Sequence, residues 1–175
     1  MGPVSAEAPA PAGRPDLFNT PLEAGLRAVV ILDAFAPRAF DLKTLSLLDY
    51  YAVHTRDVDV DAEAPESLHP PISPRRGEYF VRRRLIEDGL ALMERAFLLD
   101  RVAEEDGFAF QTRDVAAAMV DLMQSDYNAR LREAARWIAG QAEAEGQDAF
   151  FARLTASVDR WEHEVDGSLD DAGAS

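Results

Sequence analysis

Arginine residues cluster in one short stretch of this sequence, and guanidinium groups bind phosphate and carboxylate groups. Five of the 18 basic residues fall within ten positions, namely Arg75, Arg76, Arg82, Arg83 and Arg84. Five acidic residues lie just upstream, between Asp57 and Glu66. Three interpretations follow. The cluster is a stripe that contacts DNA phosphates through Arg82, Arg83 and Arg84, a charged docking face for a partner protein, or an internal acid–arginine network that orders the proline-rich loop against a helix.

Aromatic side chains could add anchors to such a docking face, because aromatic and arginine residues dominate binding hot spots. Phe150 and Phe151 are adjacent, so they cannot both face the same side of a helix. One of them is therefore available to a partner. The predicted partner-binding residues are Arg75, Arg76, Tyr79, Arg82, Arg83, Arg84, Phe151 and Trp161.

Residues with catalytic or metal-binding spacing are harder to find. The histidines, His54, His69 and His163, are not four residues apart, so no two imidazoles share one helix face. The chain has no cysteine, no G-x-S-x-G sequence and no phosphate-cradling glycine loop. We therefore expect no catalytic residue, no metal and no cofactor.

Composition sets further bounds. The chain has 175 residues, 47% of them hydrophobic, which suits one folded domain with a small extension. The net charge of −14 repels the phosphate backbone and argues against a general nucleic-acid binder. The sequence has neither a signal peptide nor an apolar run long enough to span a membrane. Together with the absence of cysteine, this favours a cytoplasmic protein.

The arginine cluster must be positioned by helices. Asn19 or Thr20 can cap a helix that begins at Pro21, and Asp41 can cap a second helix from Leu42 to about residue 55. Prolines exclude regular structure over residues 56–76, and a third helix is expected over 77–95. Asp106-Gly107 then predicts the turn of a β-hairpin over 97–111.

Further helices are expected over 112–123, 126–141 and 147–165. Helices followed by a two-stranded hairpin predict a mainly α protein with a winged-helix-like domain, in which the third helix takes the recognition position. The predicted organisation is a disordered lead or misassigned start (1–16), the winged-helix-like domain (17–124), a C-terminal helical bundle (125–166) and a disordered acidic tail (167–175).

Several sequence strings resemble the middle component, type two, of bacterial ABC three-component systems, which include or lie close to the Lamassu defence operons. The resemblance runs from about Phe18 to Trp161. It rests on Phe18–Arg27, on Phe40–Leu42 before Leu48–Tyr50, and on Ser67–Pro71 leading through Gly77-Glu78 to Val81–Leu90, and the part from Ser67 to Leu90 is the most specific.

The resemblance implies a non-enzymatic accessory subunit. Such a subunit would bridge or regulate an ABC ATPase of the SMC and Rad50 type and an effector, often a nuclease, in defence against phages or plasmids. On this hypothesis, reversing the charges of Arg82 and Arg83 would disrupt the complex and leave the chain folded. The alternative is a dimeric winged-helix transcription regulator that reads operator DNA.

Overall fold

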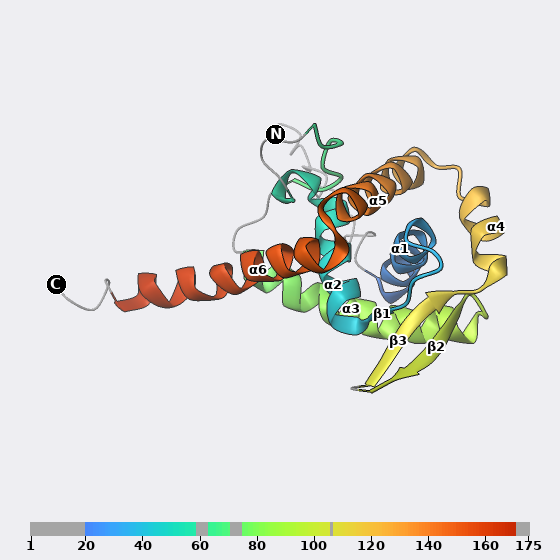
Figure 1. Cartoon of the computed structure of the whole chain (residues 1–175), viewed down its shortest axis with the longest axis horizontal. Coiled ribbons are helices and arrows are strands. Elements are labelled where there is room, and N and C mark those ends of the chain that lie inside the picture. Colours follow the sequence, from blue (N-terminus) through green and yellow to red (C-terminus); the bar gives the residue numbers. More distant parts are fainter. Residues whose placement is uncertain (1–19, 59–62, 71–74, 106, 171–175) are drawn as a thin grey trace, which may run out of the picture.

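The computed structural model describes residues 20–58, 63–70, 75–105 and 107–170, without the side chains of 75–80, 159 and 161–170. The predicted lead (1–16) and the last five residues of the predicted tail lie outside these ranges. The chain forms a mainly helical fold with one small antiparallel sheet (Figure 1). None of the helices within the described ranges is both long and apolar enough to cross a bilayer.

The first two helices start where their capping residues predict. In α1 (Pro21–Ala34), the backbone N–H of Glu23 donates to Thr20 Oγ1 at 3.3 Å, and the backbone N–H of Thr20 donates back to Glu23 Oε2 at 3.1 Å. Asp41 caps α2 (Leu42–Val53) by accepting from the backbone N–H of Thr44 at 2.7 Å. A short 3₁₀ turn, η1 (Thr55–Asp57), follows, and α3 runs over Arg75–Arg95, two residues earlier than predicted.

The predicted hairpin forms and gains a third strand. It consists of β2 (Leu99–Glu104) and β3 (Gly107–Thr112), and their register pairs Glu104 with Gly107. Gly107 of the predicted turn therefore begins β3, and Asp106 lies outside the described residues. The strand β1 (Phe40–Asp41) pairs with the other side of β3, so the order in the sheet is β1-β3-β2. A two-residue strand is too short to leave a hydrophobic period in the sequence, which is why the sequence did not predict it.

Three helices complete the fold: α4 (Asp114–Leu122), α5 (Asp126–Glu145) and α6 (Gln147–Asp170). The N-cap residue Ser125 begins α5, and Gly146, with φ of +89°, separates α5 from α6 as predicted. The helix α6 ends at Asp170, so the first residues of the predicted disordered tail are helical.

One hydrophobic core joins all of these elements. In Figure 1, α1 lies between α5, α4 and the sheet, and it contacts α2, α3, α4 and α5. Leu131 and Ile138 of α5 and Phe150 and Leu154 of α6 belong to the same buried cluster as Ile31 of α1. The C-terminal helices therefore pack on the same core as the part predicted to be winged-helix-like.

The central contact between α1 and α3 is made by two glycines. A Cβ atom on Gly25 would lie 2.6 Å from the carbonyl oxygen of Gly89, and one on Gly89 would lie 2.5 Å from the backbone nitrogen of Gly25. Both distances are far below van der Waals contact, and the opposing atoms belong to backbone that cannot rotate away. Glycine at both positions is therefore what lets the two helices approach so closely.

We predict that Gly89→Ala lowers the free energy of unfolding by about 1–3 kcal/mol, because the added methyl group forces α1 and α3 apart. Urea unfolding followed by circular dichroism measures this change. Gly140→Ala on α5 is the control: nothing lies within 4 Å of a Cβ there, so it should stabilise the protein by about 0.5–1 kcal/mol. Equal effects of the two changes would show that the glycine contact is not tight.

Candidate functional site

A buried ion cluster joins the first three helices. Asp49 of α2 has no exposed surface, and it lies between Arg27 of α1 and Arg82 of α3, each only 2% exposed. Arg27 Nε donates to Asp49 Oδ1 at 2.6 Å, and its Nη2 donates to Oδ2 at 3.2 Å. Arg82 Nη1 donates to the same Oδ2 at 3.0 Å. One carboxylate therefore binds two guanidinium groups from two different helices.

The electrostatics of the cluster keep Asp49 ionised. Burial by itself would raise the pKa of Asp49, but the guanidinium groups of Arg27 and Arg82 outweigh it and hold that pKa below its usual range. Burial would also lower the pKa of Arg27, yet the Asp49 carboxylate raises it, so the arginine stays charged. All three groups are therefore charged while buried.

The cluster also holds the loop segment 63–70 in place through His69. Arg82 Nη2 lies 2.8 Å from His69 Nδ1, and because a guanidinium group can only donate, Nδ1 accepts and the ring proton sits on Nε2. Burial, followed by the positive charges of Arg82 and Arg27, lowers the pKa of His69 to about 4. Its backbone N–H donates to the carbonyl of Val53 at 3.1 Å. A neutral His69 thus completes the arginine cluster.

Two more contacts fix the same segment. The hydroxyl of Thr55 donates to the carbonyl oxygen of Pro65 at 2.5 Å, and Arg130 Nη2 of α5 donates to the carbonyl oxygen of Ser67 at 3.2 Å. The anchored segment and η1 border an open groove of about 350 Å³. Its lining residues are His54, Arg56, Asp57, Glu66, Ser67, Leu68, His69 and Pro70.

The polar side chains that line this groove are hydrogen-bonded within the fold. The hydroxyl of Ser67 contacts the hydroxyl of Thr55 and the backbone N–H of Arg56, both at 3.4 Å, rather than His69. His69 Nδ1 is engaged by Arg82, so it is not positioned to take a proton from Ser67. Within the described ranges, no group of three or more His, Asp or Glu side chains could hold a metal ion.

The structure corrects the position of Arg82, which we predicted to contact a partner or DNA. Its guanidinium group points inward and is bound by Asp49, so it presents no surface to either. Reversing the charge of Arg82 would place a second carboxylate beside Asp49 inside the fold, so we expect that change to destabilise the chain. The internal network interpretation applies to this arginine, although its acid comes from α2 rather than from the acidic run at 57–66. Arg83 and Arg84 are exposed.

The remaining predicted residues fall into two groups. Phe151 is half-buried, with its ring 5.4 Å from that of Phe40 and 6.2 Å from that of Phe35, so it packs against the core rather than standing free for a partner. The side chains of Arg75, Arg76, Tyr79 and Trp161 lie outside the described part of the structure.

A comparison with known protein families matches residues 17–164 to the family described as ABC-three component (ABC-3C) system Middle Component 2. The chain belongs to this family. Comparisons with curated proteins and with solved structures give no match. The resemblance seen in the sequence is thus confirmed, and the whole buried cluster lies within the matched residues of the middle component.

Sequence reasoning missed Arg27, Asp49 and His69 as one cluster. A signal was present for Asp49, which shares its helix face with Leu45 and Ala52. A charged residue on an apolar face is rarely buried without a partner of opposite charge. The sequence could indicate that Asp49 has such a partner, but Arg27 and Arg82 are 22 and 33 positions away from it.

We predict that Asp49→Asn lowers the free energy of unfolding of the middle component by about 3–5 kcal/mol, because it leaves two buried guanidinium groups without a counter-charge. Chemical denaturation measures the loss. Asp100→Asn is the matched control, since Asp100 pairs with Arg113 at the surface, where an ion pair contributes about 0–1 kcal/mol. If Asp49→Asn lowers the free energy of unfolding no more than Asp100→Asn does, the buried cluster does not contribute as proposed.

We also predict a pH dependence of stability from His69. The unfolded chain protonates this histidine near its ordinary pKa of 6.5, whereas the folded chain does so only at about 4. The unfolded state therefore binds more protons between these values, and the free energy of unfolding falls as the pH is lowered from about 6.5 to about 4. In His69→Gln, whose amide does not titrate, the fall should be shallower. Identical pH profiles for the two proteins would refute this assignment.

Proposed function

We propose that this middle component is a non-enzymatic adaptor that holds an SMC- or Rad50-like ABC ATPase and an effector in one defence complex. Its family membership supports a role as one part of a multi-component ABC system. The ATPase supplies the nucleotide chemistry, so the adaptor itself needs no phosphate-binding loop. Since that ATPase works on cytoplasmic ATP, we expect the adaptor in the cytoplasm.

The observation that carries this proposal is that the consecutive arginines of α3 have different surroundings. Arg82 points into the buried cluster, while Arg83 and Arg84 are exposed on the same helix. Neither of the exposed pair makes an ion pair with another described residue. The buried Arg82 keeps α3 from rotating, so the backbone positions of Arg83 and Arg84 are fixed relative to the rest of the fold. We propose that their guanidinium groups meet carboxylates of the ATPase or the effector.

We further propose that α1, β1, α2, α3, β2 and β3 form a winged-helix unit. The order of these elements, and a sheet in which β1 joins the hairpin on the β3 side, support that assignment. The helices α5 and α6 would then be the extension that packs onto it.

The alternative of a DNA-reading regulator is weaker for a physical reason. It relied on three consecutive arginines, and Arg82 is bound to Asp49 inside the fold. The next exposed charges along α3 are Glu87 and Asp88. These carboxylates repel a phosphate backbone, as does the net charge of −14.

We predict that Arg83→Glu combined with Arg84→Glu reduces co-purification of the ATPase and effector with a tagged middle component at least about tenfold, because it places like charges across the interface. The free energy of unfolding should fall by no more than about 1 kcal/mol, because the new carboxylates lie one turn before Glu87 and Asp88. Arg38→Glu with Arg95→Glu makes the same change in net charge at exposed positions after α1 and at the far end of α3, and should assemble normally. Normal assembly of the α3 variant would refute this docking face.

A further inference from the structure

A second surface lies beside the sheet, away from the anchored segment 63–70. An open groove of about 450 Å³ runs between α3, the start of α2 and the strands β2 and β3. Its lining residues are Leu42, Glu87, Asp88, Leu90, Ala91, Arg101, Phe108 and Phe110. Neither the predicted partner-binding residues nor the buried cluster contribute to it.

The groove exists because β1 is short. β1 pairs with β3 at Phe40↔Phe110 and Asp41↔Ala109, and the chain then turns into α2 at Leu42. Phe108, the next residue toward the tip of the hairpin, therefore has no cross-strand neighbour on the β1 side. Phe108 and Phe110 share one face of β3, because side chains two residues apart in a strand point the same way.

The floor of this groove is apolar and partly exposed. The side chain of Phe108 is 57% exposed, whereas Phe110, two residues further along, is 8% exposed. The guanidinium carbon of Arg101 lies 5.5 Å from the centre of each of these two rings, a cation–π arrangement that holds them in place. The groove thus offers a rigid aromatic surface, the kind of pocket in which an apolar anchor binds.

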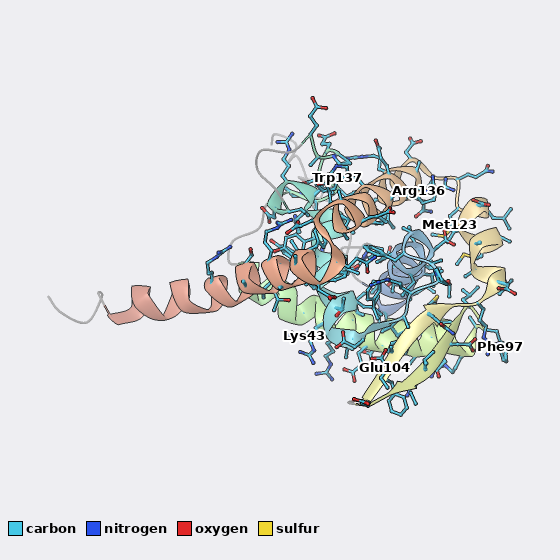
Figure 2. The ribbon with its side chains drawn as sticks, in the orientation of Figure 1. Lys43, Phe97, Glu104, Met123, Arg136 and Trp137 are labelled. Atoms are coloured by element: carbon cyan, nitrogen blue, oxygen red, sulfur yellow. The ribbon has the colours of Figure 1, made fainter. Side chains whose placement is uncertain are left out.

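One wall of the groove is acidic. Arg101, the one basic residue in the lining, is already bound to Glu94, with Nη2 2.7 Å from Oε2. Glu87 and Asp88 are exposed, and their carboxylates form no ion pair or hydrogen bond with any other described residue. Lys43 follows Leu42 at the start of α2 (Figure 2) but does not line the groove. A ligand with a basic group therefore complements this wall.

We propose that the groove binds a short segment of a partner protein in the ABC system, one that places an apolar side chain on Phe108 and Phe110 and a Lys or Arg against Glu87 and Asp88. The proposal rests on the proposed adaptor function and gives the adaptor a second contact surface. A second copy of this chain fits poorly, because a protein with a net charge of −14 repels itself at an acidic wall.

The first test uses Phe108→Ala in the full chain, co-expressed with the ATPase and effector of its own operon. We expect binding of one partner to weaken at least about tenfold, with unfolding unchanged, because the side chain is largely exposed. Phe97→Ala is the matched control. Phe97 is 66% exposed and has the guanidinium group of Arg113 5.4 Å from its ring, but it precedes β2, at the end of the hairpin opposite Glu104 (Figure 2).

Charge reversal tests the acidic wall. Glu87→Lys with Asp88→Lys should weaken binding of the same partner at least about tenfold at low salt. Binding by this variant should also depend less on the salt concentration. Glu133→Lys with Glu143→Lys makes an equal change at exposed positions on α5 and should bind normally. If both groove variants bind as well as the native chain, the groove proposal is overturned.

Photo-crosslinking identifies the occupant. Benzoylphenylalanine at position 108 of the assembled complex should cross-link to a partner segment that contains Lys or Arg, while the same residue at position 97 should not. Cross-links into residues 1–19 of this chain or into a second copy would overturn the proposal. If the native chain co-purifies with neither ATPase nor effector, the adaptor function itself fails. If the native complex assembles and the groove variants assemble equally well, only the groove proposal fails.

Discussion

Asp49 carries a negative charge where no solvent reaches it, and two guanidinium groups from different helices neutralise it. A buried charge without its partner costs several kcal/mol, so α1, α2 and α3 must meet in an arrangement where Arg27 and Arg82 both reach one carboxylate. Apolar side chains of the same volume often give as much stability as a buried ion cluster, or more. The cluster favours one arrangement of the three helices, because a shift of any one helix would leave a buried charge without its partner.

The close crossing of α1 and α3 makes this arrangement geometrically accessible. Gly25 and Gly89 bring the two backbones into contact, and Arg82 lies two helical turns before Gly89 on the same face of α3. The contact that fixes the distance between the helices and the ion cluster that fixes their register therefore share one side of α3. His69 extends the cluster into the segment 63–70, so the loop is held by the same charges that hold the helices.

These constraints turn α3 into a rigid element with two kinds of exposed charge. Arg83 and Arg84 are followed one turn later by Glu87 and Asp88, which border the groove beside the sheet. A helix whose inner face is fixed by a buried cluster and a glycine contact cannot rotate to adapt one surface without moving the other. An adaptor that uses both surfaces would therefore hold its two partners in a defined relative position, which suits a subunit placed between an ATPase and an effector.

The sequence by itself determined most of the secondary structure, because the signals involved are local. The caps Thr20 and Asp41 and the break at Gly146 each act on the next few residues, and the helices formed where they indicated. Family membership also followed from local strings, of which 67–90 was the most specific.

What only the tertiary structure decided is the direction in which each arginine points. Arg82, Arg83 and Arg84 are chemically identical, and the helix period alone does not say which of them meets Asp49, because that carboxylate comes from a distant part of the chain. The groove beside Phe108 likewise arises from where β1 ends against β3, a contact between segments almost seventy residues apart.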